Sequence, residues 1–419
     1  MPRTPLRLHR KRVGGTTTLL GTNVPEAELG TGTTTPPPIV VDPPPPDPTD
    51  PTPPSSRRVL TGAYFEWDNP DVAIRGYEQF IERKLDLLLL FHDYNVQPGQ
   101  TADPYDHLAL PEYLSRPLRR PGNEHLGLWL GSSCVMRKLG AAGNYAREMT
   151  WSQLANGALD RTWRLQGERI QQVAVSPLRP RPRVRSPHEL DLWDWHYSPE
   201  QNAVDRGAYK EAQLRYRSIL KEVCPSVVVE VNPVSSGGNG GNKSSWSEIM
   251  PHPDAFDCLA FDCYDIIWGF YDWRPGIDPQ PSLAKQEEGW NRTLNGPRGL
   301  KYLRSEAVRL GKPMSVPEWG NGAYLYNGAY NQSGGDNGPY TRGLAEFILD
   351  PAYPPGTPGG VEAHAYWEDG PFGTSSNGVL DRRLIGRATA DEGRLLNGTP
   401  FPTDKARAEF RSRLVGATR

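Results

Sequence analysis

Eight short apolar runs, separated by amphipathic or polar stretches, most constrain the fold of this chain of 419 residues. Strands that alternate with helices are typical of parallel βαβ units, and eight such units close a barrel. We therefore predict an α/β fold, a (β/α)8 TIM barrel, with a doubly wound sheet as the alternative. The runs lie at 59–67, 85–91, 126–130, 183–185, 226–231, 256–264, 313–318 and 361–367.

The ends of these runs favour the barrel over the open sheet. Charged and aromatic residues gather where the predicted strands end, and barrel enzymes build their sites on that face. The residues concerned are Glu66, Trp67, His92, Asp93, Glu189, Tyr264, Glu318 and Trp367.

The first 57 residues differ from the rest in composition. We predict a basic, disordered arm over 1–30, a Pro/Thr-rich linker over 31–57 and the barrel domain over 58–419. A segment so rich in proline cannot bury a core and favours extended polyproline-II conformations. One interpretation is an arm that attaches the barrel to a larger assembly, and the alternative is a disordered terminus without that role.

Charge and hydropathy exclude two classes of partner. The 47 Lys and Arg residues balance 49 Asp and Glu residues, so there is no general attraction to nucleic acid. We interpret the basic run 179–185 as a solvated loop at the amino end of the fourth strand. No signal peptide is visible, and the longest apolar run, 85–91, is far shorter than the ~20 residues that cross a bilayer. We expect a soluble protein without membrane insertion or a nucleic-acid partner.

Two glutamates follow strands on opposite sides of the predicted barrel. Glu189 follows the fourth strand and Glu318 ends the seventh, so their side chains face each other across the mouth. Retaining glycosidases place two carboxyl groups about 5–5.5 Å apart, one as nucleophile and one as general acid/base. We predict that Glu189 and Glu318 form such a pair. Taken alone, Glu318 could also be a carboxylate that caps the next helix.

Several segments together carry a family resemblance. They are Pro187-His188-Glu189, the Trp-rich stretch 192–197, Pro317-Glu318-Trp319-Gly320 and the sixth run, which ends in Tyr264. Across most of residues 60–415 the chain resembles glycoside hydrolase clan A, and within it glycoside hydrolase family 26, best known for β-mannanases. The resemblance implies Glu318 as the nucleophile, Glu189 as the general acid/base, and a hydrogen bond from Tyr264 to the nucleophile.

The resemblance also implies residues that bind the sugar. Trp367 is expected to form the floor beneath the sugar at the cleaved bond. Asp191 stands where the family commonly has asparagine, and we expect it to bond a hydroxyl or to repel an acidic sugar near the cleavage point. The predicted substrate-binding set is His188, Trp193, Tyr264, Trp319, Trp367 and Trp268, with Trp129, Trp246 and Trp273 as candidates for outer subsites.

The function implied is a retaining endo-β-glycosidase that hydrolyses a polysaccharide, with β-mannan as the first substrate. No Cys/His cluster has zinc spacing, and the chemistry needs neither metal nor cofactor. Two other readings stay open. One is a barrel that binds glycans without cleaving them, and the other is a virion- or surface-attached depolymerase of bacterial glycans.

Overall fold

The computed structural model places two compact units, Met1–Pro51 and Thr52–Arg419. The residues that it describes are 6–13, 16–23, 58–65, 70–96, 112–139, 145–147, 149–191, 198–199, 203–234, 246–267, 269–273, 278–320, 323–326, 330–331, 333–368, 380–381 and 404–415.

The first unit contains two paired strands. β1 (Leu6–Val13) pairs antiparallel with β2 (Thr16–Asn23), Leu6 opposite Asn23 and Val13 opposite Thr16. This pairing differs from the disordered arm that the composition of residues 1–30 predicts. A Gly-Gly pair lies between the strands in sequence, and β-branched threonines begin the second strand; both features favour a hairpin. The predicted linker, residues 31–57, lies outside the described residues.

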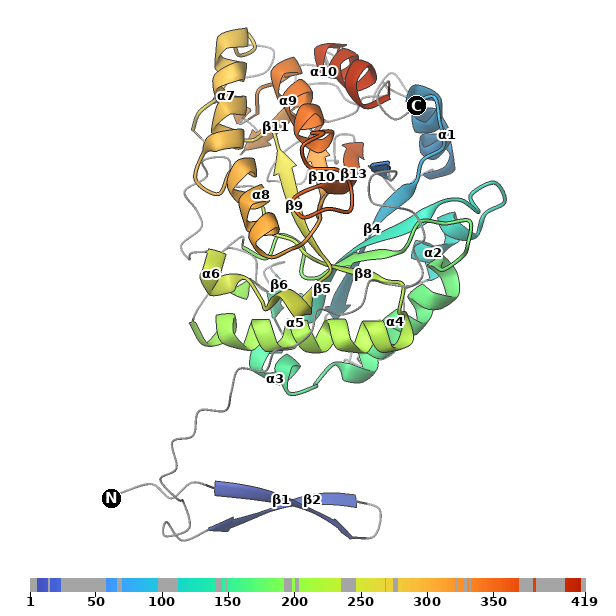
Figure 1. The fold of residues 1–419 in the computed structure, drawn as a ribbon, viewed down its shortest axis with the longest axis vertical. Coiled ribbons are helices and arrows are strands. Elements are labelled where there is room, and N and C mark those ends of the chain that lie inside the picture. Colours follow the sequence, from blue (N-terminus) through green and yellow to red (C-terminus); the bar gives the residue numbers. More distant parts are fainter. Residues whose placement is uncertain are drawn as a thin grey trace. The chain divides into compact units, whose positions relative to one another are not determined.

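The second unit is built around a closed barrel of eight parallel strands (Figure 1). Neighbouring strands follow the order β4-β3-β13-β10-β9-β8-β7-β5, and β5 pairs again with β4. The predicted barrel is therefore confirmed. The strands are β3 (Leu60–Phe65), β4 (Leu87–Val96), β5 (Gly127–Leu139), β7 (Arg183–Arg185), β8 (Val228–Val231), β9 (Cys258–Tyr264), β10 (Met314–Gly320) and β13 (Val361–Glu368).

Helices connect successive strands and surround the barrel (Figure 1). In the described part of the chain, no helix is long and apolar enough to cross a membrane. The helices are α1 (Pro70–Phe80), α2 (Glu112–Arg119), α3 (Trp151–Ala155), α4 (Asp160–Ala174), α5 (Ala203–Val223), α6 (Trp246–Ile249), α7 (Leu283–Asn295), α8 (Leu300–Arg309), α9 (Gly338–Ile348) and α10 (Asp404–Phe410).

Some short strands extend the barrel in ways that the sequence did not indicate. β6 (Tyr145–Arg147) pairs antiparallel with the far end of β5. A small antiparallel sheet joins β11 (Ala323–Tyr326), β12 (Tyr330–Asn331) and β14 (Leu380–Asp381). Because β11 begins directly after β10, this sheet starts close to the carboxyl end of the seventh barrel strand.

The barrel interior is partly apolar and partly charged. Leu87, Leu89 and Trp129 belong to a buried apolar cluster of inward-facing residues. Beside them Arg183 donates from Nε to Oε1 of Glu230 at 2.7 Å, and both side chains are almost fully buried. The inward face of β7 therefore carries a buried cation. The interpretation of the run 179–185 as a solvated loop is wrong for Arg183 and Arg185, because strand alternation turns both side chains into the barrel.

Candidate active site

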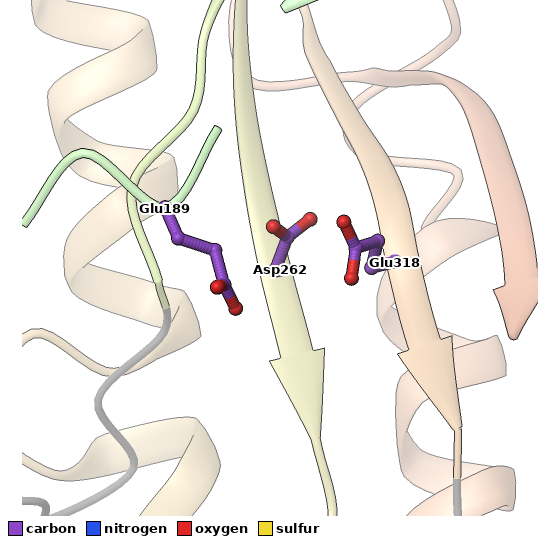
Figure 2. Close-up of side chains that lie close together, drawn as sticks. All are labelled: Glu189, Asp262 and Glu318. Atoms are coloured by element: carbon purple, nitrogen blue, oxygen red, sulfur yellow. The ribbon is translucent and has the colours of Figure 1, made fainter. Parts of the chain in front are cut away.

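Three carboxylates meet at the mouth of the barrel. Glu189 lies in the turn after β7, Asp262 lies on β9, and Glu318 lies on β10 (Figure 2). Each side chain offers one oxygen, and the three oxygens lie within 4.8 Å of one another. The carboxyl ends of parallel strands open on one face of the barrel, so residues far apart in sequence converge there. The structure thus brings the two predicted glutamates together and adds an aspartate.

Two donors hold Glu318. The hydroxyl of Tyr264 donates to Oε2 at 2.5 Å, and Nη2 of Arg185 donates to Oε1. Glu318 is 4% exposed, so protein groups replace most of its water. A carboxylate with two charge-stabilising donors and one face toward the mouth is suited to attack an electrophile. The predicted hydrogen bond from Tyr264 to Glu318 is present.

Arg185 joins Glu318 to Asp262. Its Nη1 donates to both carboxylate oxygens of Asp262, at 2.9 and 3.0 Å, and to Oδ1 of Asn232 at 2.9 Å. Burial raises the pKa of Asp262 well above its ordinary value; the charge of Arg185 opposes this effect, and the charges of Glu318 and Glu189 add to it.

Like-charge repulsion limits how many of these groups can be ionised together. Two unit charges 4.8 Å apart repel by about 3.5 kcal/mol at an effective dielectric constant of 20. Arg185 supplies one positive charge for three carboxyl groups, so we expect at least one of them to keep a proton at neutral pH. A retaining glycosidase needs one proton of this kind on its general acid.

The turn that carries Glu189 is fixed to the next strand. Glu189 has φ +48°, a left-handed conformation that is unusual for a residue with a Cβ. The following residue, Leu190, donates from its amide to the carbonyl of Asn232 at 3.1 Å. Asp191 accepts the amide of Val234 at 2.7 Å. These bonds over-determine a strained backbone, as is common where a side chain must be aimed precisely.

Asp191 does not face the cleavage point. Its side chain is fully buried, and its second oxygen accepts a hydrogen bond from Nη1 of Arg298 at 3.5 Å. The expectation that Asp191 bonds a sugar hydroxyl or repels an acidic sugar is therefore wrong. Both of its oxygens are used to hold the turn after β7 in place.

An aromatic group lies next to the carboxylates. Trp367 is half-buried and stacks on Tyr64 with ring centroids 4.1 Å apart. It also forms an edge-to-face pair with Tyr264, with ring centroids 6.2 Å apart. Phe91 contacts Trp367, and it also contacts the imidazole of His188 at 5.5 Å. The structure therefore brings Trp367, Tyr264 and His188 to the site, whereas their contacts with a sugar stay a prediction.

Trp319 lies on the other side of the barrel wall. It is fully buried, stacks on Phe410 of α10 with an interplanar angle of 13°, and donates from Nε1 to His364 at 3.2 Å. Adjacent residues of a strand point to opposite faces, so Trp319 must turn away when Glu318 points inward. The prediction that Trp319 binds substrate is wrong.

The other predicted tryptophans divide into two groups. Trp129 is buried inside the barrel and donates to Glu230 at 2.6 Å, and Trp273 donates to the carbonyl of Ser333 at 2.8 Å. Both are structural, so their assignment to outer subsites is wrong. Trp193, Trp268 and the side chain of Trp246 lie outside the described residues.

Sequence reasoning missed Arg185 and Asp262. A signal for both was present in the two-residue period of a strand. Asp262 precedes Tyr264 by two positions on β9, so both face the barrel axis. Arg185 ends β7 on the same face as Arg183. An inward phase assigned to each strand would have placed both charges beside Glu318.

The three carboxylates are close enough to serve as metal ligands. Arg185, however, already places a guanidinium between Asp262 and Glu318 and donates to each of them. The cation of this cluster is therefore a side chain, and the arrangement is suited to acid/base and nucleophilic chemistry. A guanidinium is the cation whose fork matches two carboxylates at once.

Comparison with known proteins gives distant structural likenesses. No family model and no curated protein match the sequence. Among solved structures, the chain is similar to GH26C from Muricauda sp. MAR_2010_75, with 15% identity, 86% of each chain covered and a TM-score of 0.48. It is also similar to the YdhT protein from Bacillus subtilis, with 12% identity, 85% of this chain and 86% of that chain covered, and a TM-score of 0.46. The GH26 domain of PbGH26-GH5A from Prevotella bryantii has 11% identity, 75% and 85% coverage, and a TM-score of 0.41.

Proposed function

We propose that this chain is a retaining endo-β-glycosidase that hydrolyses a polysaccharide through a covalent glycosyl-enzyme intermediate. The observation that carries the proposal is the spacing of Glu189 and Glu318, whose nearest oxygens lie within 4.8 Å. Retaining enzymes hold their carboxyl groups about 5–5.5 Å apart, whereas inverting enzymes need about 6.5–9.5 Å to admit a water molecule.

The two glutamates take different roles because their surroundings differ. Glu318 is held by Arg185 and Tyr264, so it attacks the anomeric carbon and forms the ester. Glu189 is only partly buried, and it gives its proton to the leaving oxygen. It then removes a proton from the water that cleaves the ester. No cofactor takes part in this sequence of steps.

β-Mannan is the first substrate to test, on the strength of the resemblance in the segments around Glu189 and Glu318. Reducing-end release should be measured on mannan, glucomannan, xylan, β-glucan and bacterial exopolysaccharides. We expect wild-type protein to cleave at least one of them. Glu318→Gln should abolish that turnover, and Glu189→Gln should lower kcat by about 10²–10⁴-fold, the usual contribution of general acid/base catalysis.

Two controls make this experiment decisive. Glu287 is an exposed residue of α7, and Glu287→Gln should leave turnover unchanged. Addition of azide to Glu189→Ala should yield a β-glycosyl azide, because a small anion can attack the ester without a general base. If the protein bound a glycan without releasing reducing ends, the proposed enzyme would be a glycan-binding barrel instead. A glycosyl azide in the α configuration would exclude the retaining mechanism.

A further inference from the structure

The guanidinium of Arg185 is divided between two carboxyl groups. Its Nη2 faces Glu318, and its Nη1 faces Asp262 and Asn232. An arginine fork is planar and rigid, so the position of one nitrogen fixes the position of the other. Whatever holds Nη1 therefore sets the direction of the donor that reaches the nucleophile.

Asp262 is the most deeply buried of the three carboxyl groups. Its side chain is fully buried, whereas Glu318 is 4% exposed and Glu189 is partly exposed. Burial raises the pKa of Asp262 well above its ordinary value; the charge of Arg185 and a hydrogen bond with Asn232 oppose this effect, and the charges of Glu318 and Glu189 add to it. Ionisation is thus least favourable at Asp262, and Glu318 has the additional donor Tyr264.

We propose that Asp262 is a positioning residue for the nucleophile: as a neutral carboxylic acid it holds Nη1 of Arg185, fixes Nη2 on Glu318 and leaves the guanidinium charge to Glu318. The role rests on the proposed function, because it assigns Glu318 as the nucleophile. Asp262 has no exposed surface, so it acts through Arg185 rather than on the sugar.

The groups that face Asp262 come from every element around it. They are Arg185 of β7, Glu189 of the turn that follows, Asn232 after β8, Tyr264 of β9 itself and Glu318 of β10. Only Arg185 is a cation in this set. Ionisation of Asp262 would add a second anion to the guanidinium and weaken its hold on Glu318.

The first test needs no substrate, so it can fail separately from the proposed function. An ordinary aspartate has a pKa of about 3.9. Because the folded-state pKa of Asp262 is raised, its contribution to the free energy of unfolding is complete below the pKa of the unfolded chain. That contribution is lost as the pH rises through the pKa of the folded protein. Asp262→Asn cannot titrate, so its urea midpoint should rise relative to wild type as the pH rises. The midpoints should be compared across the pH range.

A matched aspartate should behave in the opposite way. At Asp86 burial raises the pKa, but hydrogen bonds from Arg58 and the amide of Thr61 outweigh this effect and leave the pKa lowered. The contribution of Asp86 to stability is therefore present at neutral pH and lost as the pH falls, so Asp86→Asn should lose most relative to wild type at neutral pH. If Asp262→Asn shows the same pH trend as Asp86→Asn, Asp262 is ionised and the proposal is overturned.

Kinetics separate positioning from a purely structural role. With 2,4-dinitrophenyl β-mannobioside the leaving group needs no proton from Glu189, so an alkaline decline in wild-type kcat/KM reports another group. We expect that decline in wild type and not in Asp262→Asn, which should keep most of the neutral-pH kcat. Asp262→Ala loses the acceptor for Nη1, and its kcat should fall by about 10²-fold with little change in KM, because the nucleophile is misplaced.

One measurement on unmodified protein covers the case in which the variants do not fold. A neutral carboxylic acid has an infrared carbonyl band distinct from that of a carboxylate. In wild type at neutral pH this band should be present and should shift when aspartate is labelled with carbon-13. If no such band responds to the aspartate label, Asp262 is ionised and the proposal is wrong.

Discussion

Two buried arginines lie two residues apart on β7, and they show how the same side chain can serve structure or chemistry. Arg183 contacts Glu230 at 2.7 Å and Glu362 at 3.2 Å. Arg185 contacts Asp262 and Glu318, and Glu318 keeps a small exposed fraction of 4%. Both face the barrel axis, as the strand period requires.

The two arginines differ in the hydrogen bonding and the exposure of their carboxylate partners. Glu230 is completely buried and accepts hydrogen bonds from Arg183, Trp129 and Ser315, so its bonding capacity is used within the protein. Glu318 has two donors and keeps some exposure at the mouth. A saturated, closed ion pair supports the barrel, whereas an incompletely covered one can act on a ligand.

The largest effect on stability should come from the closed pair. Arg183→Met leaves Glu230 as an uncompensated buried charge, which costs about 3–5 kcal/mol of unfolding free energy. Urea unfolding would measure it. The double variant Arg183→Met/Glu230→Gln should recover much of the loss, because the stranded charge is removed. A single variant as stable as wild type would show that Glu230 takes up a proton without cost, and the comparison would fail.

Substitution of Arg185, which with Glu318 forms the open pair, should lower activity more than stability. Arg185→Lys keeps the charge but replaces the two-nitrogen fork with one ammonium, which cannot hold Asp262 and Glu318 in the same geometry. We expect kcat on the polysaccharide to fall by about 10²-fold, the cost of a misplaced reacting group. Arg183→Lys is the matched control and should change stability more than kcat. Equal losses of kcat in the two variants would contradict the division of roles.

The sequence predicted the barrel well because the signal for it is repeated. Eight strand-like runs, each with its connection, had to be consistent with one closed sheet, so an error at one boundary did not change the architecture. The meeting of Glu189 with Glu318 followed from the same topology, since both come at the carboxyl ends of parallel strands. Position along the fold was thus sufficient to find these two residues.

Direction was harder to predict than position. Asp191 is two residues from Glu189 and Trp319 is adjacent to Glu318, yet both turn away from the mouth. Arg185 was hidden in a run that resembles a solvated basic loop. For the strand residues, the inward phase of each strand decides whether a side chain faces the mouth. For Asp191, the hydrogen bonds of an irregular turn decide it. A turn of that kind has no period from which a direction can be inferred.

The smallest and most local effect should come from a glycine that belongs to neither pair. A Cβ on Gly131 of β5 would lie 2.8 Å from the ring of Phe91 and 3.2 Å from Nη2 of Arg185. The ring of Phe91 lies 5.0 Å from the guanidinium of Arg185, so Gly131→Ala should displace both. We expect a stability loss of about 1–3 kcal/mol from overpacking and a kcat reduced by about 10-fold.

Gly62→Ala provides the control for this last change. Its Cβ would lie 3.1 Å from Cβ of Ala365 and 3.2 Å from both Cβ and the carbonyl oxygen of Leu87, so the overpacked contact does not involve Arg185. It should lose stability by a similar route and keep its kcat. If both alanine variants lost the same fraction of kcat, overpacking anywhere in the barrel would disturb the site. If only Gly131→Ala lost kcat, the orientation of Arg185 would depend on the absence of one methyl group from a neighbouring strand. The geometry of Arg185 and Glu318 would then depend on a residue that bears no charge.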